Sequence, residues 1–172
     1  SLSSTIAPED YIKSPSAFSS YVDGWGWFGT LTSINRNNMY KLKSFNDGTL
    51  VYPTGSLLGR VTSAYSSVIE NTFDYMQYEN NGSVIVDVSI ENIELSGGDI
   101  LTAYIDGEIR GQVNPQLFPL TNEYLFGMMV YGDDNSDNIE FEYYNYFNGK
   151  TYALNHDLIG FESDMIIGSY LD

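Results

Sequence analysis

The side chains that could do chemistry in this 172-residue sequence are mostly acids and aromatics, because cysteine is absent and histidine occurs once. Without thiols the chain has no disulfides, zinc–thiolate sites or cysteine nucleophiles. His156 is followed by Asp157, but one imidazole beside one carboxylate is not a catalytic triad. A glycosidase needs only two acids, yet with 23 acidic residues some suitable pair is almost inevitable and carries no signal. We therefore expect a protein that is not an enzyme.

Two tryptophans, Trp25 and Trp27, are the strongest candidates for ligand contact. Residues two apart on a β-strand project from the same face, and nearby Tyr21 would extend an aromatic platform. Exposed rings of this kind stack on sugars or anchor a protein partner. The alternative is that one tryptophan forms the core of a small domain. The surrounding glycines also match G-x-G-x-x-G, but the bulky residues between them exclude a phosphate cradle.

A third candidate is an acidic run with the spacing D-x-N-x-D, formed by Asp133, Asn135 and Asp137. Alternate oxygen ligands of this kind open calcium-binding loops, so these three residues are a candidate Ca²⁺ site. The run departs from an EF-hand at its sixth and twelfth positions, where Gly and Glu are required. A solvated acidic turn is the alternative. Asp99 and Asp106 are weaker calcium candidates, and each also suits a turn.

The charge balance excludes whole classes of partner. With 7 basic and 23 acidic residues, the formal net charge is −16. Such a chain is repelled by phosphate backbones and anionic lipids, so we expect no nucleic-acid binding. No apolar run approaches the ~20 residues that cross a bilayer, so we also expect no membrane insertion. No export signal is recognisable, and we expect any such signal to have been removed already.

The elements that must position these residues are short strands. Val84, Val86, Val88 and Ile90 alternate with mostly polar residues, which predicts a half-buried strand. Asp106-Gly107 suits the two positive φ values of a type I′ turn and predicts a hairpin. The predicted strands of this part of the chain cover residues 83–91, 100–105, 108–113, 124–131, 139–144, 150–154 and 165–167. Strands at this spacing predict an antiparallel β-sandwich.

The first 55 residues look different, since they carry both tryptophans and weaker strand patterns. Strands are predicted there over residues 11–13, 26–31, 39–42 and 50–52. A Pro-Thr-Gly-Ser stretch then reads as a linker. We therefore predict an all-β chain with a small N-terminal β module over residues 1–56 and a β-sandwich over residues 57–172.

Several runs resemble tandem non-catalytic β modules of large secreted or surface-attached bacterial proteins, including adhesins. The run that starts at Asp99, D-I-L-T-A-Y-I-D-G-E-I-R-G, is similar to their D-I-(I/L)-A-A-F-V-(G/D)-G-E-x-R-G hairpin. A later F-N-G-K turn at Phe147 and a closing F-x-x-D-x-x-x-G-S signature at Phe161 match in order. The resemblance covers most of the chain, but its motifs are structural rather than catalytic.

The resemblance implies a place outside the cell or at its surface. It also implies that the small module is incomplete here, because related modules carry a further Trp-containing strand before it. A strand donated by a neighbouring chain would complete that sheet, unless the sheet is rearranged and needs none. We expect a non-catalytic adhesion or assembly module that binds a protein or surface partner, with Ca²⁺ as candidate stabilising ion. The alternative is a carbohydrate-binding module that uses Trp25, Trp27 and Tyr21.

Overall fold

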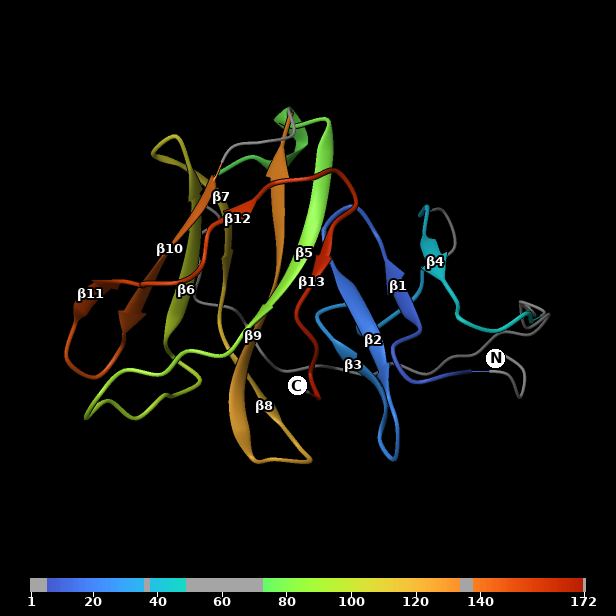
Figure 1. The fold of residues 1–172 in the computed structure, drawn as a ribbon, viewed down its shortest axis with the longest axis horizontal. Helices are drawn as coiled ribbons and strands as arrows, with labels where there is room; N and C mark the ends of the chain where they lie inside the picture. The colour runs from blue at the N-terminus through green and yellow to red at the C-terminus, as the bar shows by residue number, and fades with distance from the viewer. Residues whose placement is uncertain (1–5, 36–37, 49–72, 134–137, 172) are drawn as a thin grey trace.

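The structure is a computed structural model that describes residues 6–35, 38–48, 73–133 and 138–171. Over these residues the chain forms thirteen strands and one short 3-10 helix, Tyr75–Gln77, and it has no α-helix. The strands make three sheets (Figure 1). The predicted fold class, a mainly antiparallel β-sandwich preceded by a small β module, is confirmed. The predicted boundary at residues 56 and 57 lies outside the described residues.

The N-terminal sheet has four antiparallel strands in the order β3-β2-β1-β4. Its strands are β1 (Tyr11–Lys13), β2 (Phe18–Val22), β3 (Gly26–Gly29) and β4 (Lys41–Lys43). A tight turn joins β2 to β3, closed by a 3.2 Å hydrogen bond from the Trp25 N–H to the Val22 carbonyl. Gly24, with φ +77°, supplies the positive φ that the turn requires. The strand predicted at residues 50–52 lies outside the described residues.

The outer sandwich sheet has the order β11-β10-β6-β7, with β12 attached to β10. These strands are β6 (Ile100–Ile105), β7 (Glu108–Val113), β10 (Asn138–Asn145), β11 (Lys150–Ala153) and β12 (Ile159–Gly160). Asp106 and Gly107 between β6 and β7 have φ values of +53° and +77°. This pair of positive values agrees with the predicted type I′ turn.

The second sandwich sheet has the order β13-β5-β9-β8. It consists of β5 (Asn80–Val86), β8 (Gln116–Phe118), β9 (Glu123–Gly132) and β13 (Ile166–Ile167). β13 runs parallel to β5, whereas the other pairs are antiparallel. The main core lies between the two sandwich sheets and includes Leu101, Phe126, Phe141 and Tyr143.

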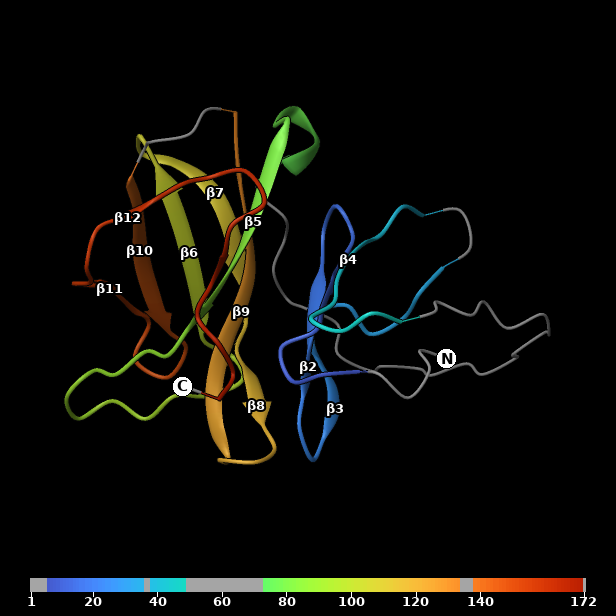
Figure 2. The same ribbon diagram turned by 45° about the vertical axis from the view of Figure 1, so that its right-hand side comes forward.

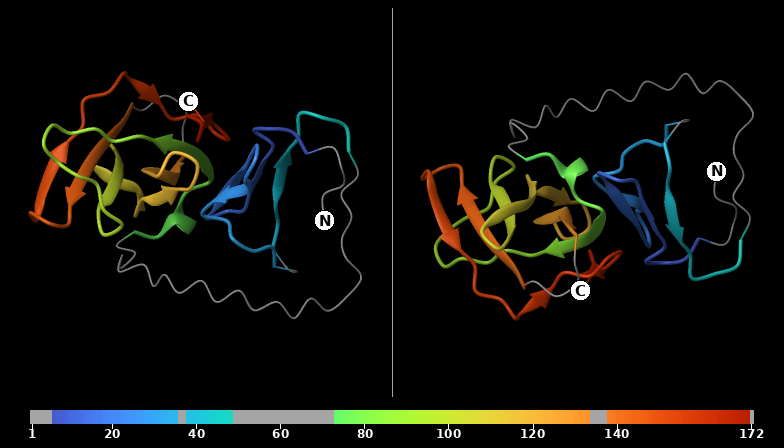
Figure 3. Two further views of the ribbon diagram at one scale, coloured as in Figure 1. Left: turned by 90° about the horizontal axis from the view of Figure 1, so that it is seen from below. Right: turned by 90° about the horizontal axis from the view of Figure 1, so that it is seen from above.

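The sheet that contains β9 is the middle one of three layers. Both faces of β9 are therefore covered. Phe126, Met128 and Val130 point into the sandwich, while Leu125 and Met129 belong to a second core. The small module closes that second core with Tyr11, Phe18, Val22 and Phe28, which cover the outer side of the β5–β9 sheet (Figures 2 and 3). The nearly continuous apolar run in β9 is the sequence pattern of a strand buried on both faces.

Candidate functional site

The two tryptophans occupy different structural positions. Trp27 lies in β3, whereas Trp25 lies in the preceding turn and is 56% exposed. The strand geometry expected to put both indoles on one face therefore does not apply. Trp27 pairs instead with Tyr21 on β2, with ring centroids 5.7 Å apart in an edge-to-face arrangement. Turn geometry at Gly24 and Gly26 takes Trp25 out of the strand.

The strand register divides the small sheet into two faces. Tyr21 lies opposite Trp27, and Ile12 lies opposite Leu42, so these side chains alternate with those that enter the second core. We call the four residues Ile12, Tyr21, Trp27 and Leu42 the outer face. The core of the small module is formed by residues such as the fully buried Phe18, and neither tryptophan belongs to it. Both tryptophans therefore remain available for contact with a ligand.

Further apolar side chains of the small module are exposed to solvent. Met39 is 83% exposed, Ile34 61%, and Phe45 57%, and Leu42 on the edge strand β4 is also exposed. The sandwich also exposes large apolar side chains, including Met76, Leu158 and Phe147, which lies at the turn between β10 and β11. Exposed apolar side chains mark a binding surface where they form a contiguous patch, and singly scattered ones are common on any protein.

The predicted calcium loop is placed only in part. Asp133 directly follows β9; its Oδ1 accepts a hydrogen bond from the Glu79 N–H at 3.0 Å, and its carbonyl accepts one from the Asn80 side chain. Asn135 and Asp137 lie outside the described residues. Over the described ranges, no cluster of three His, Asp or Glu side chains is suited to hold a metal ion. The calcium site therefore stays a prediction.

Asp99 has a structural role that its sequence context did not reveal. Its carboxylate is completely buried and accepts hydrogen bonds from the Ser96 N–H at 2.6 Å, the Ser96 hydroxyl at 3.0 Å, the Tyr143 hydroxyl at 2.8 Å and the Tyr146 N–H at 2.9 Å. Buried carboxylates need such partners. Protein donors thus occupy both oxygens, and Asp99 ties the loop before β6 to the end of β10.

His156 does not form an acid–base pair with the carboxylate next to it. Its ring packs edge-to-face on Phe141 at 5.1 Å, and its Nδ1 lies 2.7 Å from the main-chain oxygen of Asp157. The imidazole is exposed at the surface. This environment is that of a packed surface histidine.

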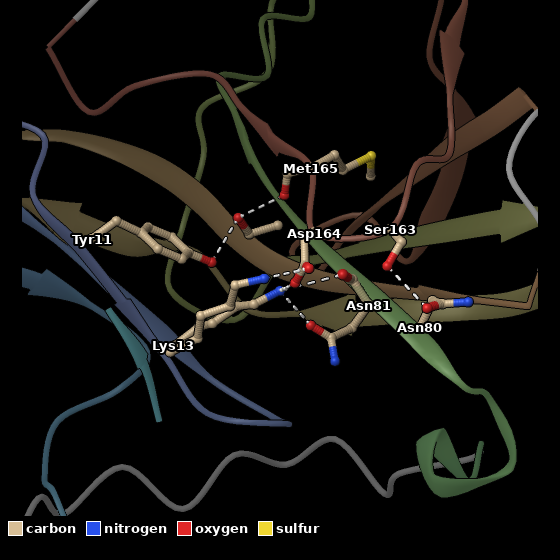
Figure 4. Close-up of polar contacts among 9 residues, drawn as sticks. Tyr11, Lys13, Asn80, Asn81, Ser163, Asp164 and Met165 are labelled. Atoms are coloured by element: carbon tan, nitrogen blue, oxygen red, sulfur yellow. Dashed lines mark hydrogen bonds and ion pairs between the residues drawn. The ribbon is translucent and has the colours of Figure 1, made fainter. Parts of the chain in front are cut away.

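The small module and the sandwich meet in a polar cluster next to the second core (Figure 4). Lys13 is 6% exposed, and its Nζ lies 2.6 Å from Asp164 Oδ1 and 2.8 Å from Asn81 Oδ1. The Tyr11 hydroxyl donates to Ser83 Oγ at 2.8 Å. We call these five residues the junction cluster. No local sequence pattern marks the contact between Lys13 and Asn81, because the two positions lie 68 residues apart.

Asp164 is held in the junction cluster from both sides. Its N–H donates to the Asn81 carbonyl at 2.9 Å, and its φ of +65° turns the chain sharply at this point. Its carboxylate also pairs with Lys41 of β4. Hydrogen bonds from Lys13 and Lys41 hold the pKa of this carboxyl below its usual range.

Two shallow grooves flank the junction cluster. One, of about 240 Å³, lies between Tyr11, Ser20 and Lys43 of the small sheet and the C-terminal segment around Ser169. The other, of about 220 Å³, is lined by residues that include Lys13 and Lys41. Both are smaller than the ~300 Å³ at which small-molecule sites usually begin.

Comparisons with known proteins identify no relative. No protein-family model matches the chain, and no curated protein or solved structure matches it. Within the described parts of the chain, no helix has the length and apolar character needed to span a membrane. The resemblance to bacterial surface modules therefore rests on the sequence motifs and stays a prediction.

Proposed function

We propose that this chain is a non-catalytic extracellular adhesion or assembly module that binds a protein or other surface partner. The observation that supports the proposal is the exposure of apolar side chains on β4 and on the loops of a small module whose sheet packs its inner face on the sandwich. Leu42, Met39, Phe45 and Trp25 are all exposed in this module. Large apolar and aromatic side chains supply most of the binding energy at protein interfaces.

The small sheet offers this surface in a fixed position. Its inner face packs on the sandwich through Phe18 and Tyr11. Lys13 also connects β1 to the sandwich through its contacts with Asn81 and Asp164. A surface that is already ordered loses less conformational entropy when it binds. The chain's negative charge favours a partner that is neutral or basic.

The edge strands provide a second means of contact. Over the described residues β3 pairs only with β2, and β4 pairs only with β1. A strand from a neighbouring chain would add to either edge by main-chain hydrogen bonding. Binding of this kind is expected to slow amide hydrogen exchange in β3 or β4, and unchanged exchange in both strands of the complex would contradict it.

A binding screen against extracellular and cell-surface proteins tests the proposal, with the chain immobilised through its C-terminus. We expect Leu42→Asp and Trp25→Ala to weaken any specific binding at least about tenfold, as loss of an interface anchor does. Phe147→Ala is the matched control, because it removes an exposed aromatic ring from the sandwich. Equal loss in all three variants, or no binding to any protein, would contradict the proposal.

Carbohydrate binding is the second candidate, supported by the neighbouring rings of Trp27 and Tyr21 on the outer face. Aromatic rings bind the apolar faces of sugars. On a glycan array we expect Trp27→Ala to abolish binding and Phe147→Ala to retain it. Glycan binding that survives Trp27→Ala would exclude this platform. Protein binding without any glycan binding would favour the first candidate.

A further inference from the structure

Three side chains of the junction cluster have the arrangement needed for amide exchange between a lysine and an asparagine. Lys13 Nζ lies 2.8 Å from Asn81 Oδ1, and Asp164 Oδ1 lies 2.6 Å from the same nitrogen (Figure 4). An amine, a carboxamide and a carboxylate thus meet where the small module contacts the sandwich. We propose that Lys13 and Asn81 become joined by an intramolecular isopeptide bond, with Asp164 as the proton carrier.

The reacting atoms are already within range of each other. A C=O bond is about 1.2 Å long, so a nitrogen hydrogen-bonded to Asn81 Oδ1 lies about 3 to 4 Å from Asn81 Cγ. This separation approaches that of a near-attack conformer. Lys13 is 6% exposed and lies on β1, which is paired on both sides by β2 and β4. Asn81 lies on β5, which is paired on both sides by β9 and β13. Both side chains therefore extend from interior strands.

Asp164 is positioned by contacts that leave one oxygen directed at the lysine. Its N–H is hydrogen-bonded to the carbonyl of Asn81, the residue that would react. Its Oδ2 pairs with Lys41, while its Oδ1 faces Lys13. A carboxylate in this position can take a proton from the lysine and return it to the leaving group.

The proposed reaction balances without a cofactor. Asp164 accepts a proton from the Lys13 ammonium, and the neutral amine attacks Asn81 Cγ, which forms the new C–N bond and moves the carbonyl electron pair onto Oδ1. Asp164 then protonates Nδ2, the Cγ–Nδ2 bond breaks as the carbonyl re-forms, and ammonia leaves. The remaining extra proton on Nζ passes through Asp164 to the departing ammonia. In sum, a lysine ammonium and a carboxamide become a secondary amide and an ammonium ion.

The electrostatic surroundings make the expected reaction slow and pH-dependent. Two lysines stabilise the Asp164 carboxylate and hold its pKa below the usual range, so it is a weak base. The rate should rise with pH, because the attack requires the lysine nitrogen to lose a proton. Lys41→Met should accelerate the reaction, because Asp164 becomes a stronger base without that cation. The product would fasten β1 to β5 and close a loop between positions 68 residues apart.

Mass spectrometry of the folded 172-residue chain tests the proposal directly. After incubation at roughly pH 8 to 9, we expect the intact mass to fall by one ammonia, about 17 Da. A protease digest should contain a branched peptide that joins Lys13 to Asn81. Lys13→Arg and Asn81→Ala should abolish the branched peptide. Asn80→Ala, the matched control at the preceding asparagine, should retain it.

The branched peptide also separates this reaction from a competing one. Asn81 precedes Gly82, and an Asn-Gly sequence can lose the same mass by cyclising to a succinimide. Because Asn148-Gly149 can cyclise in the same way, the branched peptide decides: a mass loss without that peptide, or a Lys13-linked peptide that does not involve Asn81, would overturn the proposal. So would an unchanged mass after prolonged incubation of the wild-type chain. Asp164→Asn should block cross-linking while circular dichroism shows a retained fold, and cross-linking in that variant would refute the role of Asp164.

Discussion

The hydroxyl of Tyr143 donates a 2.8 Å hydrogen bond to the Oδ2 of Asp99, and both residues are completely buried. Burial, followed by the neighbouring Asp99, raises the pKa of Tyr143 to about 12, although a hydrogen bond with Asn145 opposes that shift. The pair joins the loop before β6 to the last residues of strand β10. It therefore holds together two segments of the outer sandwich sheet.

Removing this carboxylate should be costly. Asp99→Ala leaves the buried Tyr143 hydroxyl and the N–H groups of Ser96 and Tyr146 without their acceptor. We expect a loss of at least about 3 kcal/mol in the free energy of unfolding. Urea unfolding followed by circular dichroism measures it. Asp87→Ala, at an exposed position, is the control and should change stability by less than about 0.5 kcal/mol. Equal effects of the two variants would show that the cluster does not support the fold.

Alkaline pH should weaken the attachment of the small module. Burial raises the pKa of Tyr11 to about 12; its bond with Ser83 lowers that pKa and the charge of Asp164 raises it further. The folded state therefore holds this proton more tightly than the unfolded chain, in which tyrosine titrates near pH 10. The resulting stability is complete below about pH 10 and is lost as the pH rises to about 12.

Tyr11→Phe should separate this titration from the rest of the protein. The variant loses one hydrogen bond, which costs about 1 kcal/mol at neutral pH, but its stability should fall less steeply between about pH 10 and 12. Unfolding free energies measured across this range provide the test. Tyr146→Phe, which is 65% exposed in the wild type, should leave the pH dependence unchanged. Parallel curves for Tyr11→Phe and wild type would contradict the prediction.

Calcium should stabilise the chain if Asp133, Asn135 and Asp137 form the predicted site. A ligand that binds only the folded state raises the melting temperature by mass action, so millimolar Ca²⁺ should raise it measurably. Asp137→Ala should abolish that increase. Identical melting curves with Ca²⁺ and with a chelator would exclude the site.

The charge of −16 should prevent binding to polyanions. We expect no detectable binding to duplex DNA or to anionic lipid vesicles at physiological salt, because both surfaces repel the chain. Fluorescence anisotropy with labelled DNA and vesicle co-sedimentation measure this. A micromolar affinity for either would contradict the proposed class of partner.

Strands with strong local signals were predictable from the sequence. The hairpin of β6 and β7 depends on alternation and on the two positive φ values at Asp106 and Gly107, and both features are local. β2 was missed because its sequence, F-S-S-Y-V, has two serines that interrupt the alternation. β8 and β12, with three and two residues, are too short for a periodic pattern.

The sequence by itself determined the all-β class, the main strands of the sandwich, the negative charge and the absence of thiol chemistry. Only the tertiary structure decided that β9 is covered on both faces, that Phe18 rather than a tryptophan enters the second core, and that Lys13 meets Asn81 and Asp164. The first group depends on neighbouring residues and on composition. The second depends on how separate sheets pack, because a local period shows that a strand has an apolar face but not which distant segment covers it.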